Sequence, residues 1–229
     1  MNKTEVINNL NIAVNSFFSK HNFKPYKYDS EIGWIQKNEN DLLFIDFNYI
    51  GLIHPDTGRR ESYNINPIIT ISNNEIEKHY KNITNNSYLK DPIEFRTVCV
   101  KVAVLENCKD GFFTGPHYNY VWEINYQSDV AKISSLLIDK IENVVLPNYE
   151  KLKTVEQIDK LYNDINTLDK SLIYLFGIPP RAIKGIIAAK LVDNKNVSLL
   201  IDYYSKDVLK WNEMYQKEFH NLKEYLKTF

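Results

Sequence analysis

The sequence predicts an α+β protein, in which an antiparallel sheet with flanking helices is followed by an all-helical C-terminal region. Between residues 31 and 126, apolar and polar residues repeatedly alternate with a period of two, which is typical of half-buried strands. From residue 128 onward, apolar residues recur every three or four positions, which is the helical period. Strands followed by helices favour segregated layers. We therefore expect an α+β domain at residues 1–150, and a helical region at residues 151–229 that packs on it or forms a small second domain.

A first amphipathic helix is predicted over residues 4–20, because apolar residues recur there at spacings of three and four. Thr4 or Asn2 is expected to cap its N-terminus, since short polar side chains accept hydrogen bonds from the first turn. Asn22 suits the left-handed position that follows a helix end. The first strand is then expected over residues 31–37.

Further strands are expected over residues 42–53, 60–72, 94–105 and 117–126. The turn-forming residues 54–58 should join the first two of these in a hairpin. A short helix is expected from Asn73 or Asn74 to about Tyr80. The strand at 94–105 places four valines on one face, which predicts burial on that side; these are Val98, Val100, Val102 and Val104.

The helical region should begin with Ser128 as a cap and stop at Pro147. Thr154 to Gln157 read as a capping box that opens a helix to about Asn163. Three further helices are expected at residues 168–176, at residues 181–193 with Pro179 and Pro180 in the first turn, and from a cap at Asn196 toward the C-terminus.

Charge and composition exclude several function classes. The chain has 28 Lys and Arg against 29 Asp and Glu, so no broad basic face for nucleic acid is expected. No segment approaches the apolar length of a membrane span, and the N-terminus lacks a signal-peptide core, so we expect a cytoplasmic protein without a membrane partner. The histidines and the two cysteines lack metal-ligand spacing, and no cofactor is expected. Cys99 should be a buried hydrophobe, with a disulfide to Cys108 as the alternative.

Two short motifs have simpler explanations than the functions they suggest. His54-Pro55-Asp56 contains the tripeptide of J-domain co-chaperones, but alternating strands flank it, so a turn is expected. The loop at residues 110–116 contains glycine, but a strand follows it rather than the helix of a phosphate-binding loop. Known catalytic motifs are absent from the sequence, so an enzyme is not favoured.

Two strand faces supply the candidate binding residues. An aromatic face at residues 118–126 suits stacking of ligand rings or bases, with a covered core face as the alternative. A polar face is an ordinary solvated surface or, if covered, a pocket in which Asp46 and Glu123 are the acid and base. The candidate residues are Asp46, Asn48, Asn64, Tyr118, Tyr120, Trp122 and Glu123.

Short motifs in a fixed order over residues 4–165 resemble a bacterial domain-of-unknown-function family, number 4304. The motifs are Asn22-Phe23, Ile32-Gly33-Trp34-Ile35, Val121-Trp122-Glu123-Ile124, Val145-Leu146-Pro147-Asn148-Tyr149 and Thr154–Leu161. Asn22 stands where the family usually has glycine. The family has no established activity, but related small α+β proteins are suspected immunity or accessory factors. The resemblance therefore implies a non-catalytic factor with a protein partner; the alternative is a small-molecule-binding protein or enzyme that uses the polar sheet face.

Overall fold

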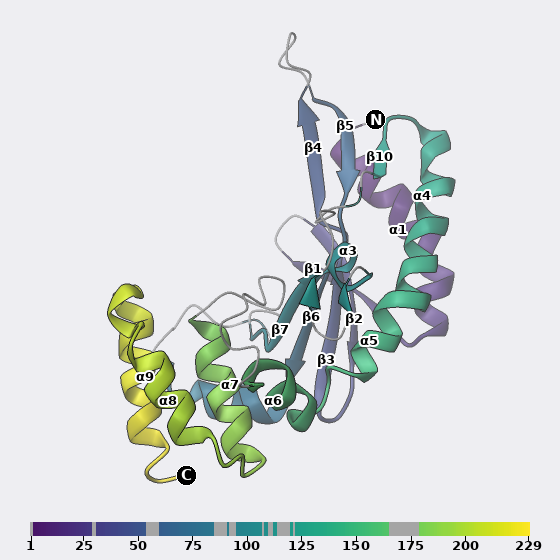
Figure 1. The fold of residues 1–229 in the computed structure, drawn as a ribbon. Coiled ribbons are helices and arrows are strands. Elements are labelled where there is room, and N and C mark those ends of the chain that lie inside the picture. The colour runs from purple at the N-terminus through teal and green to yellow at the C-terminus, as the bar shows by residue number, and fades with distance from the viewer. Residues whose placement is uncertain are drawn as a thin grey trace. The chain divides into compact units, whose positions relative to one another are not determined.

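A computed structural model (Figure 1) shows the predicted fold class, an antiparallel sheet with flanking helices and a helical C-terminal region. The structure describes residues 2–28, 31–53, 60–84, 91, 95–106, 108–109, 112–113, 120, 122–164 and 179–229. The chain divides into two compact units. The first unit comprises residues 1–38, 42–70 and 100–150, and the second comprises residues 39–41, 71–99 and 151–229.

The strands in the described residues form three sheets. The largest has the order β1-β2-β3-β6-β7, the second has the order β10-β5-β4, and β8 pairs with β9. The bounds are β1 Lys24–Tyr28, β2 Glu31–Lys37, β3 Asp41–Asp46, β4 Tyr49–Ile53, β5 Arg60–Ile65, β6 Ile68–Asn73, β7 Val98–Lys101, β8 Cys108–Lys109, β9 Phe112–Phe113 and β10 Trp122–Ile124. The sequence pattern missed β1, because this edge strand is mostly exposed and lacks apolar alternation.

Two predicted long strands are each broken in the middle. The strand predicted at 42–53 is β3 and β4, separated at Asn48, whose φ of 47° lies in the left-handed region. The strand predicted at 60–72 is β5 and β6, separated at Pro67, which has no N–H to donate to a ladder. The two breaks are joined, because the Asn66 N–H donates to the Phe47 carbonyl at 3.0 Å. The predicted hairpin is confirmed, since β4 and β5 pair antiparallel.

The prediction of a strand at 94–105 is also wrong in its second half. There α3, over Val102–Glu106, directly follows β7. The N–H of Val102 donates to the carbonyl of Pro67 at 2.8 Å, where the chain changes from strand to helix. All four alternating valines are nevertheless buried, at no more than 4% exposure. Burial rather than strand geometry therefore explains this apolar run. The strand predicted at 117–126 is reduced to β10 in the described residues.

Two helices of the first unit, α1 Lys3–Lys20 and α4 Gln127–Lys140, lie side by side (Figure 1). Asn2, rather than Thr4, caps α1, because its side chain accepts the Glu5 N–H at 2.9 Å. The expected left-handed conformation of Asn22 is confirmed by its φ of 61°. Next to this end of α1, Phe18 stacks on Trp34 with ring centroids 4.5 Å apart in the core.

The helix α4 differs from its prediction at both ends. Tyr126 occupies the N-cap position instead of Ser128, and the Asp129 carboxylate accepts the Tyr126 N–H at 2.8 Å. At the other end, Pro147 does not stop the helix. A π-helical segment over Ile141–Val145 (η2) leads into α5 Leu146–Glu150. Pro147 thus falls in the first turn of a new helical segment, where its missing N–H is tolerated.

The second unit contains α2, α6, α7, α8 and α9. Their bounds are α2 Asn74–Lys81, α6 Val155–Asn163, α7 Pro180–Leu191, α8 Val197–Ser205 and α9 Glu213–Tyr225, with a 3-10 turn (η4) at Val208–Lys210. The predicted capping box at Thr154 and the first-turn Pro180 are confirmed. The short helix expected from Asn73 or Asn74 begins at Asn74, with Asn73 as its cap. The last predicted segment is broken, with α8 beginning after Asn196 and Asn212 capping α9. The helix predicted at 168–176 lies outside the described residues.

Among the residues that the structure describes, no helix combines the length and the apolar composition needed to cross a lipid bilayer.

Candidate functional site

The predicted polar site residues fall into two separate groups. Asp46 ends β3, and its carboxylate accepts the N–H of Asn48 at 2.9 Å, which closes a local turn. Glu123 lies on β10, where it is exposed and pairs with Asn64 of β5. Asp46 therefore belongs to the five-stranded sheet and Glu123 to the three-stranded sheet. The fold uses the carboxylate of Asp46 to shape the chain break at Asn48.

The aromatic residues make the most distinctive surface feature of the first unit. The rings of Tyr120 and Trp122 stack with centroids 4.0 Å apart and an angle of 3° between their planes. Both side chains are half-buried; Trp122 begins β10, and Tyr120 precedes this strand. Tyr118 lies outside the described residues. We call the stacked pair Tyr120 and Trp122 the aromatic platform.

Charged and amide side chains hold the aromatic platform in place. The hydroxyl of Tyr120 donates to Oε2 of Glu106 at 2.6 Å, and the other carboxylate oxygen of Glu106 accepts from Lys140. Burial raises the pKa of Tyr120, and the bond to Glu106 raises it further, so the hydroxyl remains a proton donor. The amide oxygen of Asn64 accepts the Trp122 N–H at 2.9 Å. Asn64, predicted as a binding residue, thus supports the strand that carries the platform.

Sequence reasoning missed a buried ionic cluster in the second unit. Nζ of Lys184 donates to Oε1 of Glu77 at 2.8 Å and to the carbonyl of Arg96 at 2.8 Å. The side chains of Lys184 and Glu77 are only 3% and 4% exposed. Burial lowers the pKa of Lys184, whereas the Glu77 carboxylate opposes that shift. Thr97 also donates to Glu77 at 2.6 Å.

A second buried carboxylate adjoins this cluster. The hydroxyl of Tyr80 donates to Glu218 at 2.9 Å, and Thr84 donates to the other carboxylate oxygen. Nζ of Lys184 lies 4.4 Å from the centroid of the Tyr80 ring. The Lys184 cation therefore contacts both the Glu77 carboxylate and the tyrosine that donates to Glu218. Because Lys184 and both carboxylates have hydrogen-bond partners, the cluster is suited to fixing the packing of α2, α7 and α9.

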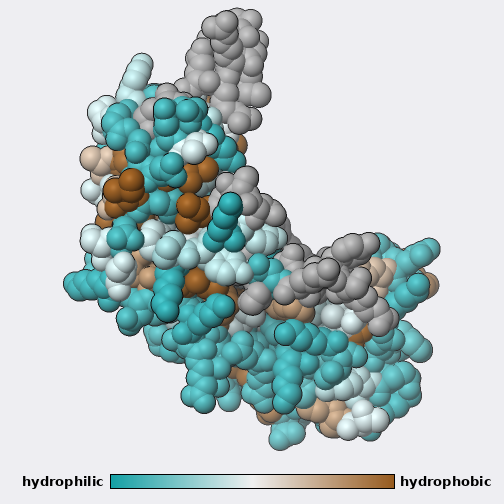
Figure 2. Space-filling view, turned by 180° about the vertical axis from the view of Figure 1, so that it is seen from behind, coloured by the Kyte–Doolittle hydropathy of each residue, from teal (hydrophilic) through white to brown (hydrophobic). Residues whose placement is uncertain are grey.

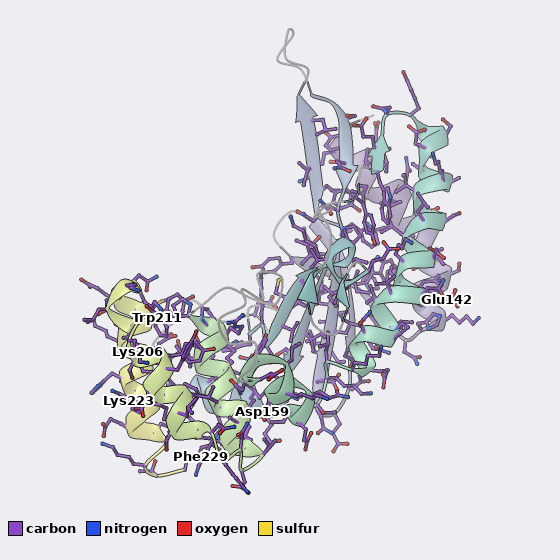
Figure 3. The ribbon with its side chains drawn as sticks, in the orientation of Figure 1. Glu142, Asp159, Lys206, Trp211, Lys223 and Phe229 are labelled. Atoms are coloured by element: carbon purple, nitrogen blue, oxygen red, sulfur yellow. The ribbon has the colours of Figure 1, made fainter. Side chains whose placement is uncertain are left out.

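Amide hydrogen bonds join α6 to α7. Asp159, labelled in Figure 3, accepts from the side chains of Asn163 and Asn194. Asn163 also donates to the carbonyl of Gly185 at 2.7 Å. A Cβ on Gly185 would lie 2.8 Å from Oδ1 of Asn163. The close approach of the two helices therefore requires glycine at position 185.

The signal that pointed to the buried cluster was present in the sequence. Arg181 and Lys184 are the charged residues in the first turns of α7, a helix that is otherwise apolar on all sides and buried from Pro180 to Ala189. A helix that is apolar all round lies in a core, so charged residues within it need internal partners.

The structure describes no group of three or more His, Cys, Asp or Glu side chains arranged to hold a metal ion. Cys99, expected to be buried, is half-buried and is not part of a disulfide. Its sulfur lies 4.0 Å from Nη1 of Arg96.

No family model matches the chain, and no curated protein or solved structure matches it significantly.

Proposed function

We propose that the protein is a non-catalytic interaction factor that binds a partner protein through the aromatic platform. The observation that carries this proposal is the parallel stack of Tyr120 and Trp122, which keeps both rings half-exposed. Tyrosine and tryptophan are enriched at protein interfaces, where they supply a large contact area. Rings that are already fixed by stacking lose little conformational entropy when a partner covers them.

The surroundings of the aromatic platform support a protein partner. Glu106 and Lys140, whose side chains are 33% and 22% exposed, form an ion pair beside it. An aromatic centre with polar groups at its edge matches the anatomy of protein interfaces. On the face shown in Figure 2, hydrophobic residues lie in small groups among hydrophilic ones. Scattered apolar residues of this kind are ordinary on a protein surface.

The resemblance to domain-of-unknown-function family 4304 suggests the kind of partner. By that analogy, the protein is an immunity or accessory factor that acts in a bacterial cytoplasm. The alternative function, a small-molecule-binding protein or enzyme on the polar sheet face, has less support. Asp46 and Asn64, two of its central residues, already accept hydrogen bonds from the backbone of their own unit.

Affinity capture from the native host, followed by a binding titration with the purified partner, tests the proposal. Trp122→Ala should raise the Kd at least tenfold, because hot-spot aromatic residues contribute more than about 1.4 kcal/mol. Tyr126→Ala is the matched control, since Tyr126 is 71% exposed and lies outside the stack. Circular dichroism should show both variants folded.

The conservative variant Tyr120→Phe separates the two parts of the site. It keeps the stacked ring but removes the hydrogen bond to Glu106, so we expect a smaller loss of affinity than for Trp122→Ala. Equal partner binding by wild type and Trp122→Ala would refute the proposal. So would metabolite turnover that is abolished by Asp46→Asn or Glu123→Gln.

A further inference from the structure

The second unit contains a buried cation that lacks a described counter-charge. Arg181 is only 3% exposed, and its Nε has no hydrogen-bond partner. None of the described carboxylates forms an ion pair with it. An arginine cannot lose its proton in a protein, so burial cannot be relieved by neutralisation. A buried charge without a partner costs several kcal/mol, which an anion would offset.

The position of Arg181 in α7 adds to the local positive potential. Arg181 lies in the first turn, directly after Pro180. The N-cap residue, Pro179, makes no side-chain cap hydrogen bond, and this first turn contains no acidic residue. A helix N-terminus carries roughly half a positive charge. The guanidinium and the helix dipole therefore attract an anion to the same place.

Tyr204 of α8 supplies a second buried polar group. Burial raises the pKa of Tyr204, and the Arg181 guanidinium opposes this shift through its charge and through a side-chain hydrogen bond. Arg181 and Tyr204 are therefore neighbours. The hydroxyl proton of Tyr204 has no acceptor among the described residues, although the residue is only 2% exposed. A buried hydroxyl proton without an acceptor is costly, and it can be donated to an anion.

Lys184 provides the contrast within the same helix. One turn further along α7, its ammonium is fully engaged by Glu77 and the Arg96 carbonyl. The fold therefore neutralises one buried cation of α7 with its own carboxylate but supplies no described carboxylate to the other. This difference leaves Arg181 as a buried cation of α7 without a described carboxylate partner.

We infer that Arg181 and Tyr204 form a binding site for an oxyanion, the phosphate or carboxylate group of a small molecule, at the N-terminal end of α7. The guanidinium presents parallel N–H groups that match two oxygens of such a group. The Tyr204 hydroxyl donates to a further oxygen. The inference does not depend on the proposed function, because it uses residues of the second unit only.

Thermal unfolding of the full chain tests the site, with inorganic phosphate, succinate and chloride compared at matched ionic strength. A ligand that binds only the folded state raises Tm with its concentration. We expect phosphate or succinate to raise the Tm of the wild type above its value in chloride, and Arg181→Gln to lose this rise. The matched control is Lys190→Gln, which removes a positive charge from the last turn of α7 and should keep the rise. The response to phosphate or to succinate identifies the class of oxyanion.

Two further measurements keep the test decisive. By titration calorimetry, Tyr204→Phe should weaken binding of the effective anion several-fold. Without anion, Arg181→Gln should be at least as stable as the wild type, because it removes an unpaired buried charge. If Arg181→Gln does not fold, the wild-type titration and Tyr204→Phe decide. The site is refuted if neither anion stabilises the wild type beyond chloride, if Arg181→Gln responds equally, or if Tyr204→Phe binds with unchanged Kd.

Discussion

Lys184 and Glu77 form a bidentate ion pair inside the second unit, with Nζ 2.8 and 2.9 Å from the two carboxylate oxygens. Lys184→Met should destabilise the protein by about 3–5 kcal/mol, because it leaves the Glu77 carboxylate buried without a cation. Urea unfolding followed by circular dichroism measures this loss.

A double-variant cycle separates the pair from general damage to packing. Glu77→Gln combined with Lys184→Met should cost less than the sum of the two single changes. Each single change leaves one buried charge without its partner, whereas the double change removes both charges. Lys227→Ala removes an ion pair with Glu224 in which both side chains are more than half exposed, and it should change stability little. A Lys184→Met variant with the wild-type urea midpoint would contradict the prediction.

Gly185 should not tolerate alanine, although alanine is the better helix former by about 1 kcal/mol. The new Cβ would lie 2.8 Å from Oδ1 of Asn163 and 3.2 Å from Cβ of Tyr162. Asn163 is held by its bonds to Asp159 and to the Gly185 carbonyl, so it cannot move aside freely. We expect a lower Tm for Gly185→Ala. In an Asn163→Ala background the same change should cost less, and an equal cost in both backgrounds would rule out this contact as the cause.

Asp129 should make the stability of α4 depend on pH. Its carboxylate accepts the N–H groups of Tyr126 and Asn125, which hold the pKa of Asp129 below its ordinary value of 3.8. A lowered folded-state pKa stabilises the fold above the unfolded-state pKa, and this contribution is lost as the pH falls through the folded-state pKa. Asp129→Asn should therefore lower Tm at neutral pH, with a difference from wild type that shrinks in acid. Ser128→Ala, at the cap expected from sequence, should leave Tm unchanged at both pH values. A larger loss of Tm from Ser128→Ala than from Asp129→Asn would show that Ser128, and not Asp129, stabilises the N-terminus of α4.

The helices were the most predictable part of the fold, because caps and apolar periodicity act locally. Thr154 caps α6 as expected, and α2 begins at Asn74, one of its two expected starts. The strands were less predictable, because alternation shows burial but not where pairing stops. Val102 and Val104 continue an alternating pattern, yet they lie in α3. Their burial was therefore predictable, while their helical conformation depends on contacts such as the one between Val102 and Pro67.

The candidate site was predictable only where it depends on neighbours in the sequence. Spacing by two places Tyr120 and Trp122 on one face, and their rings stack. The partner Glu106 lies 14 residues away, and no local pattern joins it to Tyr120. The same limit applies to Glu77 and Lys184, which are 107 residues apart in the sequence. Long-range pairs of this kind follow from tertiary packing alone.

Asn48 should prefer replacement by glycine to replacement by alanine. Its φ of 47° is left-handed, a conformation that costs alanine about 1–2 kcal/mol and glycine much less. The backbone N–H of Asn48 donates to Oδ1 of Asp46, and both replacement residues keep this N–H, so the bond survives both changes. In urea unfolding, Asn48→Gly should match the wild type closely, and Asn48→Ala should be less stable by about 1 kcal/mol. At Asn143, an exposed residue of the helical segment η2, the order should be the opposite, with alanine more stable than glycine. The same order of stability at both positions would show that the break between β3 and β4 does not depend on a left-handed residue.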